Sequence, residues 1–102
     1  MQTHIRKKVE IIVERAQMRR VLELVEALGA TGYTVLPTLA GKGHHGLRAG
    51  DGVAQVFDSV MIIAITTEPI ARAVLNQVTA AMADYIGIVA VSDVEVARPE
   101  HF

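Results

Sequence analysis

The chain contains no cysteine and no tryptophan, and it has only two tyrosines, two phenylalanines and three prolines among its 102 residues. Without cysteine there is no disulfide framework, no thiolate nucleophile and no Cys-based metal or redox centre. The charge is also nearly balanced, since ten Lys and Arg face eleven Asp and Glu, giving a formal net charge of -1. This balance argues against a general nucleic-acid-binding protein, which would carry a basic surface.

Long hydrophobic runs are also missing. The longest continuous apolar stretches, 60–65 and 86–91, are far shorter than the roughly 20 residues that span a bilayer. We therefore expect a cytoplasmic protein. Hydrophobic residues nevertheless make up 51% of the chain, whereas a chain of this length buries only about 60–65% of its unfolded surface. We expect a single domain, residues 1–102, with part of its apolar surface covered by a partner subunit.

The first half of the chain carries the pattern of a strand, a helix and a second strand. Alternation over 8–14 predicts a strand, and apolar residues spaced at i, i+3 and i+4 over 15–28 predict a helix. Gly29 supplies a left-handed end to this helix. The β-branched and aromatic segment 32–40 predicts a second strand, which Pro37 places at an edge or a bulge.

The second half repeats this order. Residues 55–66 are apolar on both faces toward their end, which predicts a central strand. Thr67 provides a capping hydroxyl and Pro69 stands in the first turn of a second helix. Ile88 to Val91, continued by the alternation over 93–96, predict the last strand, at an edge or a subunit contact.

The resulting order, βαββαβ, is that of a ferredoxin-like α+β fold, with an antiparallel sheet and both helices on one face. The other face of such a sheet has no helix to cover it. Packing of sheets from several subunits would cover this face and account for the apolar composition. The fold alone says nothing of function, because it carries many functions.

The sequence gives little support to an enzymatic function. Residues 41–46 match the string G-x-G-x-x-G, but no helix opens on the last glycine, so the dinucleotide-binding context is missing. Ser59 and Ser92 lie in or at the end of predicted strands and outside any nucleophile turn. A small enzyme would need a polar cluster on the uncovered sheet face, for which Asp58 is an isolated candidate.

The segment 40–55 holds five of the eight glycines and shows neither helical nor strand periodicity. Its cationic and imidazole side chains outnumber its single acid, Asp51; they are Lys42, His44, His45 and Arg48. Converging backbone N–H groups with Lys and Arg donors would bind an anion. The same composition also suits a solvated loop, and composition leaves both interpretations open.

Three short motifs resemble the PII-like signalling proteins over essentially the whole chain. They are Gly32-Tyr33-Thr34-Val35, Gly41-Lys42-Gly43 and Tyr85-Ile86-Gly87-Ile88. The chain is most similar to the branch associated with bicarbonate transport and carboxysomes. The resemblance implies a homotrimer that binds adenine nucleotides between subunits and signals without catalysis. It also implies a T-loop, about 41–54, that contacts a target such as a bicarbonate transporter or a carboxysome-linked protein.

Carried over residue by residue, by motif or by position in the chain, the resemblance implies a set of nucleotide-binding residues. Gly32 and Thr34 would lie at the adenine end, and Ile65 would pack on the ring. The ribose and phosphates would meet Gly41, Lys42 and Gly43, with Arg98 approaching phosphate. Gly87 and Ile88 would line the cleft. Bicarbonate, as a second ligand, would be held by loop N–H groups including that of Gly43, by Lys42 and by Arg48.

The sequence also departs from the classical family pattern. The loop has no modifiable tyrosine, and His44 and His45 stand where a glutamine that helps to hold 2-oxoglutarate is expected. The segment 82–88 has no lysine, which favours ADP or AMP over ATP. The tail has no cysteine, which excludes a redox switch there. The alternative is a trimeric metal-binding protein of the CutA kind with His44 and His45 as ligands.

Overall fold

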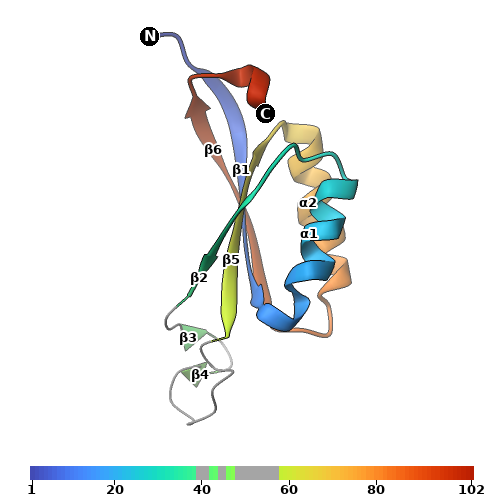
Figure 1. Cartoon of the computed structure of the whole chain (residues 1–102). Helices are drawn as coiled ribbons and strands as arrows, with labels where there is room; N and C mark the ends of the chain where they lie inside the picture. Colours follow the sequence, from blue (N-terminus) through green and yellow to red (C-terminus); the bar gives the residue numbers. More distant parts are fainter. Residues whose placement is uncertain (39–41, 44–45, 48–57) are drawn as a thin grey trace.

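The computed structural model describes residues 1–38, 42–43, 46–47 and 58–102. One antiparallel sheet holds β1 (His4–Glu14), β2 (Thr34–Pro37), β5 (Ser59–Thr66) and β6 (Gly87–Val96), in the order β2-β5-β1-β6. Helices α1 (Met18–Ala27) and α2 (Glu68–Ala81) both lie on one face of this sheet (Figure 1). The predicted ferredoxin-like α+β fold is confirmed.

The core lies between the helices and the sheet, because the helices bury the sheet face that they cover. Every second residue of β1 faces the helices: Val9, Ile11 and Val13 are each at most 1% exposed. Both helices bury one stripe of side chains against these strands. The buried partners on the other elements are Val21, Val25, Val60, Ile62, Ala64, Ala71, Val74 and Val78.

Several local predictions can be compared with the structure. Gly29 has φ 110° and follows the end of α1, as predicted. Pro37 ends the edge strand β2, and β5 lies centrally between β2 and β1, also as predicted. The capping prediction for Thr67 is wrong in one respect. Thr67 does precede α2 with an extended backbone, but its hydroxyl makes no capping hydrogen bond.

Strand β1 begins at His4, earlier than the alternation over 8–14 indicated. The reason lies in its partners, since β6 pairs with it as far as His4↔Val96 and supplies backbone hydrogen bonds to a polar stretch. We call this end of the sheet, where His4, Thr66 and Val96 lie, the tail end. We call the opposite end, where Pro37, Ser59 and Gly87 lie, the loop end.

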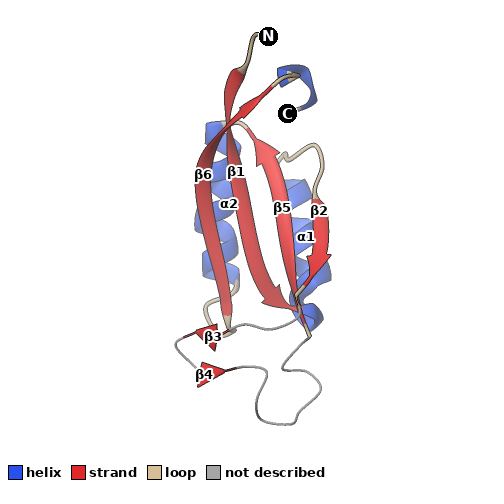
Figure 2. Ribbon diagram, turned by 90° about the vertical axis from the view of Figure 1, so that its left-hand side faces the viewer, coloured by secondary structure: helices blue, strands red, loops and turns tan. Residues whose placement is uncertain are grey.

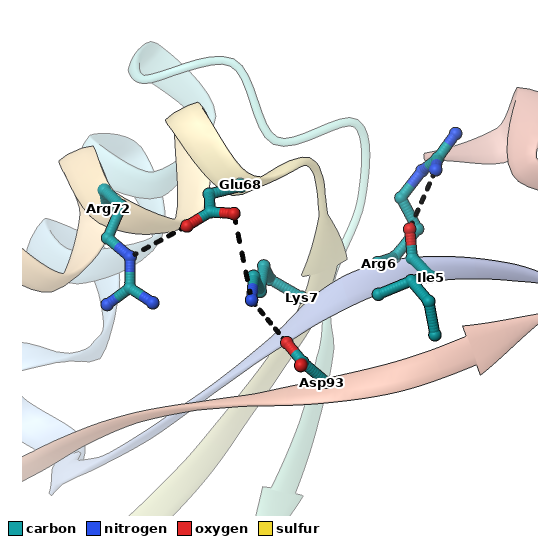
Figure 3. Close-up of polar contacts among 6 residues, drawn as sticks. All are labelled: Ile5, Arg6, Lys7, Glu68, Arg72 and Asp93. Atoms are coloured by element: carbon teal, nitrogen blue, oxygen red, sulfur yellow. Dashed lines mark hydrogen bonds and ion pairs between the residues drawn. The ribbon is translucent and has the colours of Figure 1, made fainter.

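An ion-pair chain ties the start of α2 to the sheet near the tail end (Figure 3). The Lys7 ammonium contacts the Asp93 carboxylate on β6 and lies 3.9 Å from Glu68 Oε2 on α2. Arg72 Nε lies 3.6 Å from the other oxygen of Glu68. The chain links α2, β1 and β6 with balanced charges, so it serves the fold and leaves no net charge for a ligand.

The face of the sheet away from the helices, which we call the open face, is turned to the viewer in Figure 2. Four apolar residues stand in one row across all four strands: Leu36, Met61, Ile12 and Ile88. The two at the ends of the row, Leu36 and Ile88, are 44% and 58% exposed. Lys8 and Glu10 form an ion pair on the same face at 3.7 Å. The open face therefore combines exposed apolar surface with a central pair of charges.

Candidate functional site

The start of β2 brings three predicted nucleotide-binding residues together. Gly32 lies exposed between α1 and β2, and the exposed Thr34 opens β2 on the open face. Thr34 pairs with Ile63 of β5, so the half-buried Ile65 is its diagonal neighbour on that face. A Cβ atom built on Gly32 would meet nothing within 4 Å. The result is an accessible strip of backbone, hydroxyl and apolar side chain.

Arg98 belongs to the same end of the molecule. The chain leaves β6 at Val96 and closes a short 3-10 helix at Pro99–His101, with Arg98 directly before it. The hydroxyl of Thr31 donates a hydrogen bond to the carbonyl oxygen of His101 at 2.8 Å. This contact places the tail beside the residue that precedes Gly32. Arg98 is exposed, and within the described part of the chain no carboxylate pairs with it.

Gly87 and Ile88 lie at the loop end of the sheet, where they line an open hollow of about 390 Å³. The other lining residues are Val13, Thr79, Met82, Ala83 and Val89, so the hollow has no charged wall. A Cβ atom on Gly87 would stand 3.1 Å from the Ile12 carbonyl oxygen and 3.2 Å from Val13 Cγ1. Because β1 approaches so closely, a side chain here would crowd β1, and glycine is favoured. The hollow suits an apolar or aromatic group.

The predicted loop residues are described only in part. Lys42 and Gly43 form β3 (Lys42–Gly43), which pairs with β4 (Gly46–Leu47). The prediction of no regular structure in the segment 40–55, which has neither helical nor strand periodicity, is wrong at this two-residue ladder. Both views place β3 and β4 beyond the loop end of the sheet (Figures 1 and 2). The remaining predicted ligands lie outside the described residues: Gly41, His44, His45 and Arg48.

The predicted residues thus fall into two groups that are far apart within one chain. The group at the start of β2 and the tail holds Gly32, Thr34, Ile65 and Arg98, whereas Gly87 and Ile88 stand on β6. Strands β2 and β6 are opposite edges of the sheet, about 14 Å apart across three strand spacings. Gly87 pairs with Val13 and Val96 with His4, so the two ends of β6 are about 30 Å apart. One pocket of a single chain cannot hold both groups.

The structure also brings in residues that sequence reasoning missed. Thr31 contacts His101 across 70 positions of sequence, and no local spacing signals such a contact. Asp58, the isolated candidate for a small enzyme, is paired with Arg15, whose Nε lies 2.5 Å from its Oδ1. The Arg15 backbone N–H also donates to the Asp58 carbonyl oxygen at 2.8 Å. Asp58 therefore fixes the start of β5 to the end of β1.

The described residues also bear on the alternatives. They contain no group of three or more His, Cys, Asp or Glu side chains placed to hold a metal ion. Of the helices formed by those residues, none is both long enough and apolar enough to cross a membrane. His44 and His45, on which the metal-binding alternative rests, lie outside that part of the chain.

Comparison of the chain with known proteins identifies the family to which it is similar. The model of the family "Nitrogen regulatory protein P-II" matches residues 6–101. No curated protein matches the sequence. Among solved structures, the chain is similar to CPII, a nitrogen regulatory PII-like protein from Thiomonas intermedia K12, bound to ADP, AMP and bicarbonate. The identity is 32%, the match covers 99% of this chain and 96% of the other, and the TM-score is 0.87.

Two further structures of the same Thiomonas protein agree with this likeness. The complex with ADP and bicarbonate is 33% identical, with 99% and 97% of the two chains covered and a TM-score of 0.84. The complex with ADP, AMP and acetate is 30% identical, with 100% and 98% covered and a TM-score of 0.84. The family match spans nearly the whole chain and the PII-like neighbours share its fold throughout. The chain belongs to the P-II family of nitrogen regulatory proteins and is PII-like.

Proposed function

We propose that this chain is a signalling protein without catalytic activity that binds an adenine nucleotide between the subunits of a homotrimer. The observation that carries the proposal is the separation of the two residue groups, which one chain cannot bring to one ligand. Structural neighbours that share about a third of the sequence bind ADP and AMP. A site shared by two chains reconciles these facts.

In the proposed site, one chain contributes the start of β2 and the tail. Gly32 and Thr34 face the base, Ile65 packs on it, and Arg98 reaches a phosphate. The neighbouring chain contributes its loop end: Gly41, Lys42 and Gly43 at the ribose and phosphates, with Gly87 and Ile88 along the wall. The hollow beside Gly87 has no cation in its lining, which favours ADP or AMP over the more highly charged ATP.

The open face supports the trimer. It exposes the apolar row from Leu36 to Ile88, and water-exposed apolar rows of this kind mark contact surfaces. Packing of three such faces together would bury the row. It would also bring β2 of one copy toward β6 of the next. The same packing therefore covers the apolar surface and assembles the nucleotide site.

Bicarbonate is the proposed second ligand, held by Lys42, Gly43 and Arg48. The neighbour from Thiomonas holds bicarbonate in three structures and acetate in another. Both are small carboxylate-like anions, which backbone N–H groups and cationic side chains recognise. The bicarbonate site stays a prediction because Arg48 lies outside the described residues.

The signal is proposed to leave the protein through the T-loop, about 41–54, of a single domain spanning residues 1–102. Its target would be a bicarbonate transporter or a carboxysome-linked protein, reached from the cytoplasm. The protein would thereby report energy and inorganic-carbon status. No observation favours the metal-binding alternative, so one function is proposed.

Mixed trimers test the shared site. Lys42→Ala and Arg98→Ala each remove one phosphate contact, but from opposite sides of the same site. Isothermal titration should show weak ADP binding to each variant alone. Co-refolded mixtures should regain one intact site per mixed trimer, seen as a tight-binding fraction. Mixtures that bind no better than the separate variants would contradict the shared site.

Titration of the wild-type chain tests the ligands. AMP, ADP, ATP and adenosine are compared with and without bicarbonate, and acetate serves as the matched anion. We expect saturable binding of ADP and AMP and a change in their affinity with bicarbonate, because ligands at adjoining sites are coupled reciprocally. Absence of nucleotide binding would overturn the proposed function.

A further inference from the structure

The tail of the chain is held by side chains from two other elements. Thr31, between α1 and β2, donates its hydroxyl to the His101 carbonyl oxygen at 2.8 Å. Arg6 of β1 donates a hydrogen bond from Nη2 to the Pro99 carbonyl oxygen at 3.4 Å. Its Nη1 donates to the Ile5 carbonyl oxygen at 2.9 Å. Figure 3 shows the Arg6 side chain turned away from the ion pairs around Lys7. The tail is thus anchored at both ends of its short helix.

These anchors hold Arg98 between two fixed points. Val96, two residues before it, is 8% exposed at the end of β6, and the anchored Pro99–His101 turn follows it. The Arg98 side chain is exposed and has no ion-pair partner among the residues described. Its backbone is therefore constrained while its guanidinium is available.

The Thr31 anchor has a second consequence because of its position in the sequence. Thr31 directly precedes Gly32 and lies close to Thr34, which the proposed function assigns to the adenine base. Its hydrogen bond therefore joins the segment that reads the base to the tail that carries Arg98. Thr31 is itself exposed, and its only described hydrogen bond is the one to the tail.

We propose that Thr31 is a positioning residue, which sets the distance between the base-binding segment and the phosphate-binding Arg98. This inference rests on the proposed nucleotide site and extends it to a residue outside the site. Loss of the anchor should weaken only the part of the affinity that the phosphates contribute. Loss of a residue needed merely for folding would instead lower the affinities for adenosine, AMP and ADP alike.

The test compares the affinities of the full-length chain for adenosine, AMP and ADP by isothermal titration. Thr31→Val keeps the shape of the side chain and removes the donor. We expect ADP to bind roughly 2- to 10-fold more weakly, as the loss of one hydrogen bond predicts, with adenosine unchanged. Thr31→Ser restores the donor and should restore the ratio of ADP to adenosine affinity.

Thr3→Val is the matched control. Thr3 also donates a 2.8 Å hydrogen bond from an exposed hydroxyl near the tail end, but to Glu95 and not to the tail. All three affinities should stay at the wild-type value. Arg6→Met removes the second anchor and keeps the apolar stem, so it provides an independent variant if Thr31→Val does not fold; it should lower the same ratio.

The outcomes separate this inference from the proposed function. Wild-type binding of ADP with an unchanged ratio in both anchor variants would overturn the positioning role and leave the nucleotide site standing. An equal loss for adenosine and ADP would also overturn it, since the role would then be structural. Failure of the wild-type chain to bind any nucleotide would overturn both.

Discussion

Thr38 and Ser59 face each other across the base of the long loop, and Thr38 donates twice to the same acceptor. Its backbone N–H and its hydroxyl each lie 3.1 Å from the Ser59 carbonyl oxygen. On the adjoining side, Arg15 pairs with Asp58 through both backbone and side chain. The chain therefore leaves and re-enters the sheet at fixed points, whatever lies between residues 38 and 58.

The hydroxyl of Thr38 should contribute measurably to stability. Thr38→Val leaves the backbone hydrogen bond in place and removes the half-buried side-chain donor. The free energy of unfolding should fall by about 0.5–1.5 kcal/mol, the usual net value of one hydrogen bond. Urea denaturation measures the change, and Thr38→Ser, which retains the donor, serves as the control. A Val variant as stable as wild type would show that the hydroxyl contributes nothing.

Two glycines of the candidate site should respond in opposite ways to the same substitution. Gly87→Ala places a methyl group 3.1 Å from the Ile12 carbonyl oxygen, and the crowding should destabilise the fold by about 1–3 kcal/mol. Gly32→Ala meets no atom within 4 Å and should leave the unfolding curve unchanged. If a nucleotide approaches the Gly32 backbone, its affinity should nevertheless fall. Thermal unfolding and ADP titration of both variants decide the matter; a Gly32→Ala protein with normal ADP affinity would remove Gly32 from the site.

Arg98 should contribute to binding through charge. Arg98→Ala should cost about 1.5–3 kcal/mol of ADP affinity, the value of a hydrogen bond to a charged group, and nothing for adenosine. Because the side chain is exposed and unpaired among the described residues, the unfolding free energy should change by less than about 0.5 kcal/mol. Arg19→Ala, an exposed arginine on α1, is the control for general charge effects. Equal losses for ADP and adenosine would show that Arg98 does not contact phosphate.

The sequence was informative wherever one face of an element is buried. Alternation in β1 and the apolar stripes of α1 and α2 predicted the core, since burial imposes a period on the side chains. The polar start of β1 could not be predicted in this way, because its pairing with β6 depends on backbone hydrogen bonds and not on side-chain burial. The separation of Thr34 from Gly87 likewise follows from the strand order, which local patterns do not report.

Motifs predicted the members of the candidate site but not how they are held. The resemblance proposed Gly32 from a short motif and Arg98 from its position near the C-terminal end. The hydrogen bond from Thr31 to His101, which joins their two segments, connects opposite halves of the chain. Contacts of this kind depend on the folded geometry, and a single sequence carries no local mark of them.

The open face provides the last prediction, which concerns assembly. Leu36 ends the apolar row on the edge strand β2 and is 44% exposed, so Leu36→Asp should leave the fold of one chain intact. In a trimer that buries the row, each copy would carry an unpaired carboxylate into the interface, at a cost of several kcal/mol. We expect monomers at micromolar concentration by analytical ultracentrifugation, together with loss of ADP binding because the shared site is dismantled. Ile5→Asp is the matched control. Ile5 is 58% exposed on β1, but it lies outside the row and on the opposite face of the sheet. A Leu36→Asp protein that still sediments as a trimer would show that the open face is not the surface on which the copies meet.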